Sequence, residues 1–214
     1  MKVKLVDCDS IEKIIKAARI SHGSESDGMG SKDKSLIKKL IEWGHESVFE
    51  HCTYSFLIEE VSRALLQELV RHRIASYTVR STRFTLDYLI KDNEIKEAKS
   101  FSDYKRIVDR YCVVPNLPKE ALSEFYESIA LSLKKIHKFL SYYHLPNDLV
   151  KYLLPESFKT ELMMSINVRS FRNLLRLRTS KAALWEIRKL AMKMFQTLPE
   201  DHHILYEDLN LKLL

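Results

Sequence analysis

The stretch RHRIASYTVRSTRF, which runs from Arg71 to Phe84, combines four arginines, one histidine and four serine or threonine hydroxyls within fourteen positions. A cluster of positive charges is usually no more than a solvated face. Here the preceding segment, Val61 to Val70, has the apolar periodicity of a helix, so we expect a helix end that presents Arg71. The stretch therefore predicts a surface that binds an anion.

The segments before this stretch predict two strands and two helices. Lys2 to Asp7 alternates as a strand does, and Asp9 with Glu12 forms a capping box for a helix. Ser21 to Lys34 predicts a polar surface loop, either a lid or a linker, and a second helix follows it. Thr53 to Glu59 alternates as a strand again. The side chains expected to point inward from these elements are Ile11, Ile14, Ile15, Ala18, Leu36, Ile37, Leu40, Ile41, Tyr54, Phe56 and Ile58.

The segments after it predict mainly helices. Asp87 to Asp103 is charged and irregular, and Tyr104 to Tyr111 is a short helical run. Pro118 opens a long helix with a heptad pattern, which packs on another helix within the chain or across a subunit interface. Lys159 to Ile166 predicts a strand that leads into a helix, NVRSFRNLLRLR, from Asn167 to Arg178. One face of that helix carries Arg169, Asn173 and Arg176, and the other directs Phe171, Leu174, Leu175 and Leu177 toward a core.

A last helix, from Ser180 to Thr197, is expected to bury five apolar residues, and His202 with His203 is expected to lie on the surface. Together these elements predict an α+β protein with a small, mainly antiparallel sheet flanked by helices and one long heptad-patterned helix. Residues 1–214 are expected to form a single domain. The five residues expected in the core are Leu184, Ile187, Leu190, Ala191 and Met194.

Composition narrows the class of ligand and the compartment. The net charge of +6 and the pI near 9.1 favour acidic partners such as nucleotides, nucleic acid or a membrane surface. The chain has only four glycines, so phosphates would have to be held by side chains and not by a glycine-rich turn. Three widely spaced cysteines predict a reducing cytoplasm. The sequence contains no run of eighteen apolar residues, so we expect no membrane span.

Three other groups of residues invite chemical roles that the sequence does not favour. His45, Glu50 and His51 lie in one short loop without a cysteine or a helical i, i+4 pair, so we expect no metal. Cys52 begins a strand with no arginine beside it in sequence, and we interpret it as a buried structural thiol. Ser81 has no evident base within its own segment, and a hydroxyl next to arginines more often binds phosphate than attacks a substrate.

Three separated pieces, HESVFEH (His45 to His51), RHRIASYTVRSTRF and NVRSFRNLLRLR, together resemble the flavin-dependent thymidylate synthases, the ThyX family. The signature of that family is R-H-R, two residues, S, and a segment ending in S-x-R. Arg71, His72, Arg73, Ser76, Ser81 and Arg83 fill this signature without a gap. The resemblance covers most of the chain and is weakest between Leu86 and Leu145.

The resemblance implies that FAD, reduced by NADPH, carries a hydride to dUMP while methylenetetrahydrofolate supplies the one-carbon unit, which gives dTMP. It also implies a homotetramer whose sites are shared between subunits. The residues expected to bind the flavin are His45, Ser47, Glu50, Arg71, His72, Arg73, Ile74, Val79, Asn167, Arg169 and Asn173. Those expected to bind dUMP are Glu68, Arg71, Val79, Arg80, Ser81, Thr82, Arg83, Lys151 and Arg178.

Arg178 is the residue expected to be catalytic, because a guanidinium beside uracil N3 would stabilise the deprotonated ring. The chain departs from the family pattern at five positions, with Glu68 for glutamine and Lys151 for arginine, and also at Phe84, Thr78 and Val79. Two alternatives stay open at this point. One is a family member with an altered pyrimidine substrate, and the other is a basic nucleic-acid-binding module, which the spacing of the arginines with His and Asn disfavours.

Overall fold

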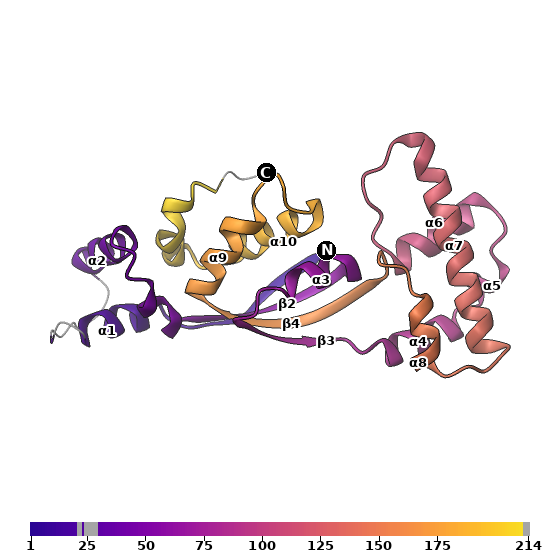
Figure 1. Ribbon diagram of the computed structural model, residues 1–214, viewed down its shortest axis with the longest axis horizontal. Helices are drawn as coiled ribbons and strands as arrows, with labels where there is room; N and C mark the ends of the chain where they lie inside the picture. The colour runs from indigo at the N-terminus through magenta and orange to yellow at the C-terminus, as the bar shows by residue number, and fades with distance from the viewer. Residues whose placement is uncertain (21–22, 24–29, 212–214) are drawn as a thin grey trace. The chain divides into compact units, whose positions relative to one another are not determined.

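The computed structural model describes residues 1–20, 23 and 30–211, and the side chain of Ser31 is outside this description. Figure 1 shows its helices and strands. Their bounds are β1 Lys2–Cys8, α1 Glu12–Ile20, α2 Ser31–Glu42, η1 Glu46–His51, β2 Thr53–Ser62, α3 Arg63–Leu69, β3 Ala75–Val79, α4 Thr82–Lys91, α5 Asn93–Glu97, α6 Phe101–Tyr111, α7 Lys119–Ser141, α8 Asn147–Val150, η2 Lys151–Leu153, β4 Lys159–Asn167, α9 Val168–Arg178, α10 Trp185–Gln196 and η3 Glu200–Leu209, where η marks a 3-10 helix.

The described chain divides into two compact units. Unit 1 comprises Met1–Glu59, Gln67–Thr78 and Leu162–Leu214, and unit 2 comprises Glu60–Leu66 and Val79–Glu161. The prediction of one domain over the whole chain stays a prediction.

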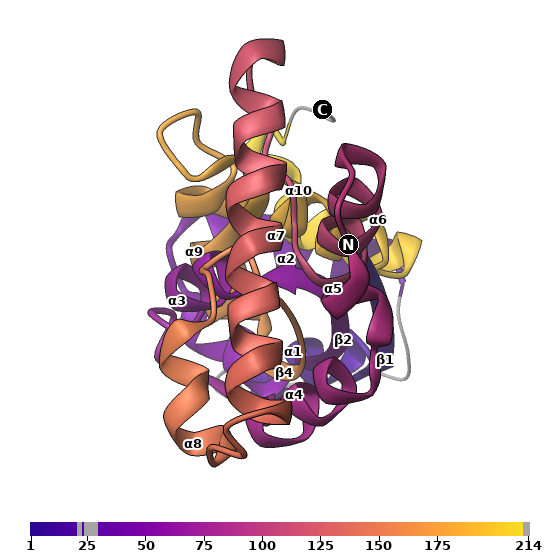
Figure 2. The same cartoon turned by 90° about the vertical axis from the view of Figure 1, so that its right-hand side faces the viewer.

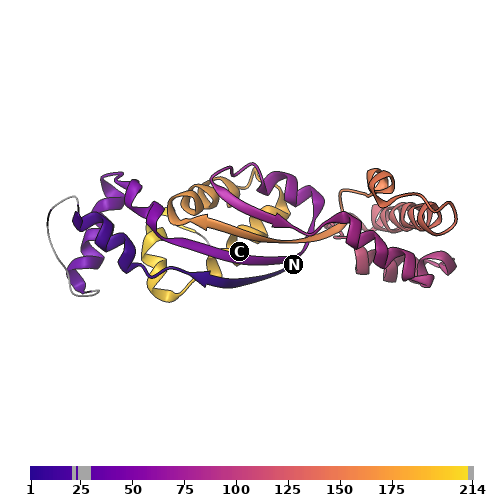
Figure 3. The same ribbon diagram turned by 90° about the horizontal axis from the view of Figure 1, so that it is seen from below.

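A four-stranded sheet with the order β1-β2-β4-β3 organises unit 1. β1 pairs with β2 in the antiparallel sense, with Lys2 opposite Glu59 and Cys8 opposite Tyr54. β2 and β4 also run in opposite directions, since the Cys52 carbonyl accepts from Val168 N and the Ser55 hydroxyl contacts that of Ser165. Helices α9 and α10 cover one face of this sheet, as Figure 3 shows. The predicted α+β class and antiparallel sheet are therefore confirmed.

The core of unit 1 is aromatic where α9 meets the sheet. Tyr54 and Phe56 on β2 are fully buried and their rings lie 5.8 and 5.7 Å from that of Phe171 on α9. The surface position predicted for His202 is wrong, because its side chain is 2% exposed and its Nδ1 lies 2.9 Å from the Tyr54 hydroxyl. A buried phenol needs a hydrogen-bond partner, and His202 supplies it. Burial also lowers the pKa of His202.

Unit 2 is built around α7, whose 23 residues span about 34 Å at 1.5 Å per residue. Helices α5 and α6 pack along α7, as Figure 2 shows. The predicted long helix is confirmed, and the partners of its buried face lie within its own unit. The side chains that α7 buries there are Tyr126, Ala130, Leu133, Ile136, His137 and Leu140.

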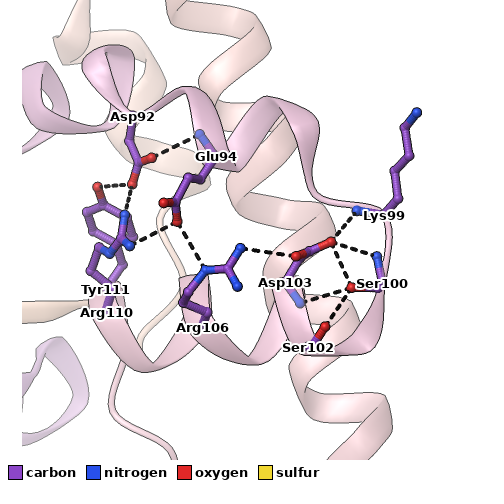
Figure 4. A network of polar contacts seen from close by, with 9 residues as sticks. All are labelled: Asp92, Glu94, Lys99, Ser100, Ser102, Asp103, Arg106, Arg110 and Tyr111. Carbon is purple, nitrogen blue, oxygen red and sulfur yellow. Dashed lines mark hydrogen bonds and ion pairs between the residues drawn. The ribbon is translucent and has the colours of Figure 1, made fainter.

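The irregular segment predicted from Asp87 to Asp103 is largely helical in the structure. Asp92 accepts a hydrogen bond from Glu94 N and caps α5, while Ser100 and Asp103 form a capping box for α6. Arg106 and Arg110 then pair with these acids, as Figure 4 shows. The charges that suggested a loop are therefore the caps and ion pairs of short helices.

Several helices begin at other residues than the sequence predicts. The helix expected from Val61 begins at Arg63, because β2 continues to Ser62. Helix α2 begins at Ser31, inside the predicted loop, and most of that loop lies outside the described residues. The capping box predicted at Asp9 does not form there: Asp9 accepts from Thr53, and the Ser10 hydroxyl accepts from Glu12 N instead. Within the described ranges, no helix combines the length and apolar content needed to cross a bilayer.

Candidate active site

Helix α9 supports the candidate site of unit 1, and its sequence separates a buried face from an exposed one. Asn167 caps the helix, because its Oδ1 accepts a hydrogen bond from Ser170 N at 2.8 Å. Phe171, Leu174 and Leu175 are fully buried, whereas Arg169, Asn173 and Arg176 are exposed, as predicted. The core position predicted for Leu177 is wrong: it is 54% exposed, because it falls on the side of the helix that faces solvent.

The exposed face of α9 forms one wall of a cleft of about 660 Å³, and the segment that follows α3 forms another. The structure thus brings together two arginine-rich motifs that lie about 100 residues apart in the sequence. The lining residues are Glu46, Glu50, Arg71, His72, Arg73, Ile74, Arg169, Ser170, Asn173, Arg176, Leu177 and Arg178. All of them belong to unit 1.

Arg178 is held by three hydrogen bonds at the wall of this cleft. Its Nε donates to His72 Nε2 at 2.9 Å, its Nη1 donates to Glu68 Oε2 at 2.9 Å, and its Nη2 donates to the Glu68 carbonyl at 3.1 Å. Its side chain is 16% exposed. A guanidinium has five N–H donors, so three bonds leave two donors for a ligand.

His72 is neutral in this arrangement. Burial lowers its pKa, the charges of Arg178 and Arg71 lower it further, and only Glu68 opposes them. Because Nε2 accepts from Arg178, the ring proton lies on Nδ1. The Tyr77 hydroxyl shares its one proton between the His72 carbonyl at 2.8 Å and the Leu69 carbonyl at 2.9 Å, which fixes the turn after α3. His72 therefore orients the guanidinium without adding a second charge.

The sequence did not point to two residues of the candidate site: Glu46, which lines the cleft, and Arg172, which donates to Glu46. Arg172 is completely buried behind the cleft, where it makes two parallel bonds to Asp208 at 2.9 and 2.8 Å and also donates to the Leu205 carbonyl. Glu46 accepts from Arg172 at 3.3 Å and from Arg176 at 3.1 Å. The signal was present, because Arg172 is a charged residue on the apolar face of α9.

Not every residue predicted for the flavin lies at the cleft. Arg71, His72, Arg73, Ile74, Glu50, Arg169 and Asn173 line it. His45, Ser47 and Asn167 are in the same unit but outside the lining, and Val79 begins the second segment of unit 2. His45 is exposed and its ring lies 5.9 Å from that of Trp43, while the Asn167 side chain is occupied as the cap of α9.

A second group of predicted residues gathers in unit 2, around the start of α4. Ser81 is the N-cap of α4, with its hydroxyl accepting from Arg83 N at 3.3 Å. Arg83 and Lys151 both bond to Asp148, at 3.0 and 3.2 Å, although they lie far apart in the sequence. The bonds from Arg83 and Lys151 lower the pKa of Asp148. Arg80 pairs with Glu161 at 3.2 Å.

The first turn of α4 is thus flanked by basic side chains, which is a favourable arrangement for a phosphate. Asp148 and Glu161 were missed, since neither lies near the basic stretch in sequence. Thr82 is the first residue of α4, and Glu68, predicted for the same substrate, lies in unit 1.

Cys52 is a buried thiol, as predicted. It is 0% exposed, and burial together with the charge of Asp9 raises its pKa to about 12. A thiol with so high a pKa is not a nucleophile at neutral pH. Among the residues that the structure describes, no group of three or more His, Cys, Asp and Glu side chains could hold a metal ion.

The fold and the two basic groups define an α+β protein whose arginine side chains are arranged to hold anionic ligands. Residues 4–202 match the model of the family described as Thymidylate synthase complementing protein. The chain is 44% identical over 183 residues to the flavin-dependent thymidylate synthase of Wolinella succinogenes, covering 85% of this chain and 84% of that protein. It is 42% identical over 189 residues to the enzyme of the same name from Helicobacter pylori, covering 86% and 85%.

The chain belongs to this family, the flavin-dependent thymidylate synthases. A crystal structure of ThyX from Helicobacter pylori with FAD and dUMP superimposes with a TM-score of 0.83 at 38% identity, covering 97% of this chain and 98% of that one.

Proposed function

We propose that the chain converts dUMP to dTMP, with FAD as hydride carrier, methylenetetrahydrofolate as one-carbon donor and NADPH as reductant. The observation that carries the proposal is the cleft of unit 1, where the R-H-R motif and Arg178 are held together by the Arg178–His72 and Arg178–Glu68 bonds. The similarity to a structure of ThyX that contains FAD and dUMP supports the same ligands.

The residues of the cleft fit a flavin nucleotide. Arg71 and Arg73 are exposed and can donate to phosphate oxygens, and a guanidinium is suited to hold them bidentately. Ile74 and Leu177 are 72% and 54% exposed, so they offer apolar surface to a ring system. When bound there, FAD would supply the hydride that the reaction requires. His45, Ser47, Asn167 and Val79, outside the cleft lining, are proposed for the flavin on the family resemblance alone.

Arg178 is proposed as the catalytic residue. Its two remaining N–H donors would face the uracil ring and stabilise negative charge as N3 loses its proton. Glu68 and neutral His72 hold the guanidinium in one orientation before the substrate arrives, so that little reorganisation is needed during the reaction. Glu68 is therefore proposed as a positioning residue for Arg178, in addition to the substrate contact predicted from the sequence.

The start of α4 in unit 2 is proposed to bind the dUMP phosphate. Ser81, Thr82 and Arg83 would donate to its oxygens, with Arg80 and Lys151 adding positive charge. The carboxylate of Asp148 holds the two basic side chains nearest to it and keeps them ordered. Because Ser81 serves as a helix cap, no nucleophilic role is assigned to it.

The assembly and the other co-substrates are also part of this proposal. A homotetramer with sites shared between subunits, the use of NADPH and the folate, and a cytoplasmic location are supported by the family resemblance. The exposed apolar side chains of Leu149 and Tyr152, which are 60% and 82% exposed, are consistent with subunit contacts.

Spectroscopy and product analysis test the proposal directly. The purified protein, or the protein reconstituted with FAD, should show flavin absorbance, and NADPH oxidation should accelerate when dUMP is added. Mass spectrometry of a single-turnover reaction with methylenetetrahydrofolate should identify dTMP. A protein that cannot be reconstituted with FAD would refute the proposal. Conversion of another pyrimidine in place of dUMP would identify a family member with altered specificity, for which the Glu68 departure is the structural reason.

A further inference from the structure

Unit 2 contains a second pocket, of about 610 Å³, that shares no residue with the cleft of unit 1. It lies among α4, α5 and α7, and its lining combines lysine side chains with the apolar side chains of Ile90, Leu131 and Tyr142. None of its described lining residues is acidic.

Four lysines define the charge of this pocket: Lys134, Lys135 and Lys138 on α7, and Lys96 on α5. Lys134 donates to the Ala98 carbonyl, and Lys138 lies over the rings of Tyr142 and Tyr143 at 5.7 and 5.6 Å. In the described part of the chain, none of the four forms an ion pair with a carboxylate. Like charges spaced by three and four residues on a helix, as in the pairs Lys135–Lys138 and Lys134–Lys138, repel one another, so an anion in the pocket would relieve this repulsion.

The basic side chains of the neighbouring α6 are neutralised by carboxylates of the same unit. There Arg106 and Arg110 are paired with Asp92, Glu94 and Asp103, as Figure 4 shows. The pocket lysines are not neutralised in this way, which leaves their charge available to a ligand.

His137 gives an independent sign that the pocket receives a ligand. It lines the pocket and is only 5% exposed, and its Nδ1 lies 3.2 Å from the Ser141 hydroxyl. Its other nitrogen, Nε2, is buried and has no hydrogen-bond partner among the described residues. A buried polar atom is normally paired, so this nitrogen calls for a partner that the chain does not supply. Nε2 can accept from a ligand N–H or O–H, or donate to an anion once it is protonated.

We propose that this pocket binds a small organic anion that carries carboxylate or phosphate groups on an apolar body. The ammonium groups of Lys135 and Lys138 would contact the anionic groups, while Ile90, Leu131 and the lysine methylenes would cover the apolar part. Lysines place flexible point charges around the pocket, so both planar carboxylates and tetrahedral phosphates are compatible with it.

Calorimetric titration with two probe anions tests the proposal. 1-Naphthyl phosphate and benzene-1,3,5-tricarboxylate represent the two anionic groups, benzyl alcohol is the neutral control, and inorganic phosphate tests whether the apolar body contributes. The titrations use the whole protein with FAD and dUMP at saturation, so that these ligands occupy their own sites. Because the pocket shares no residue with the cleft, a protein that fails the flavin assay can still be titrated, in that case without FAD and dUMP.

The decisive variant is K135Q/K138Q, and its matched control is K16Q/K119Q, which removes two exposed lysines outside the pocket. All four positions are exposed, so both variants should fold. We expect saturable binding of at least one probe anion, weakened tenfold or more in K135Q/K138Q and changed less than twofold in the control. The preferred probe then tells whether the natural ligand is a carboxylate or a phosphate. No binding of either anion, equal weakening in both variants, or unchanged binding in K135Q/K138Q would overturn the proposal.

Discussion

Replacing Arg172 with methionine should destabilise unit 1 and weaken flavin binding, although Arg172 is not among the residues that line the cleft. The guanidinium is completely buried and joins α9 to η3 through Asp208 and the Leu205 carbonyl, and to η1 through Glu46. Helix α9 carries Asn173 and Arg176 of the cleft, so loosening α9 should disturb the proposed flavin contacts.

The expected loss in the free energy of unfolding follows from the burial of the Arg172–Asp208 ion pair. Breaking a buried ion pair by removing one partner typically costs about 3 to 5 kcal/mol. The carboxylate of Asp208 is 35% exposed and can be partly rehydrated, which places the expected loss near the lower limit, at about 3 kcal/mol. For a protein of this size, that loss corresponds to a fall in the unfolding temperature of roughly 6 to 12 °C.

Circular dichroism melting at pH 7 and at fixed protein concentration, together with FAD titration, measures both consequences. Arg176→Met is the matched control, because Arg176 reaches the same two carboxylates, Glu46 and Asp208, but its side chain is 47% exposed. We expect the control to lose less than about 1 kcal/mol. If the two variants melt within a degree of each other, the reasoning from buried charge is wrong for this network.

Four further predictions concern single residues. Arg178→Lys should keep the flavin spectrum but lower turnover, because lysine lacks the planar set of donors of a guanidinium. Loss of bound FAD in this variant would show that Arg178 holds the flavin and not the uracil ring. Glu68→Gln should lower turnover, because a neutral amide holds the Arg178 guanidinium less firmly than the carboxylate does, and steady-state kinetics showing an unchanged kcat would contradict this. Ser81→Ala should retain product formation and lose about 1 kcal/mol of stability as a lost helix cap, whereas complete inactivity would identify a nucleophile. Burial raises the pKa of Asp208, but the hydrogen bonds and charge of Arg172 outweigh burial and lower the pKa overall. The stability that this carboxylate contributes should therefore be retained above about pH 4 and lost as the pH falls further. A melting temperature that stays constant from pH 5 to pH 3 would refute this.

The sequence predicted the elements whose periodicity is strong. Alternation in Thr53 to Glu59 and the apolar seam after Pro118 both correspond to observed elements, because burial of one face fixes their period. The segment from Asp87 to Asp103 was misread, since its short helices depend on side-chain caps and ion pairs that periodicity does not register.

The candidate site was predictable where its residues are contiguous and less so where partners come from afar. The R-H-R motif and α9 follow from the sequence, but the pairing of Arg178 with Glu68, 110 residues apart, is a property of the folded chain. His202 was misjudged for the same reason, because its partner, Tyr54, lies 148 residues earlier. Charged or polar residues on an apolar face, such as Arg172, are the one local sign of such distant partners.

The position of Glu46 among the arginines of α9 makes this helix unequally tolerant of mutation. Glu46 lies within 4.0 Å of Arg169, 3.3 Å of Arg172 and 3.1 Å of Arg176. Each of these arginines also pairs with a second carboxylate, which is Glu50 for Arg169 and Asp208 for the other two. Loss of one exposed arginine leaves Glu46 with two other partners, whereas loss of Glu46 leaves all three arginines with a single carboxylate each. In a population of variants, this one acidic position should accept fewer changes than either exposed arginine that it serves.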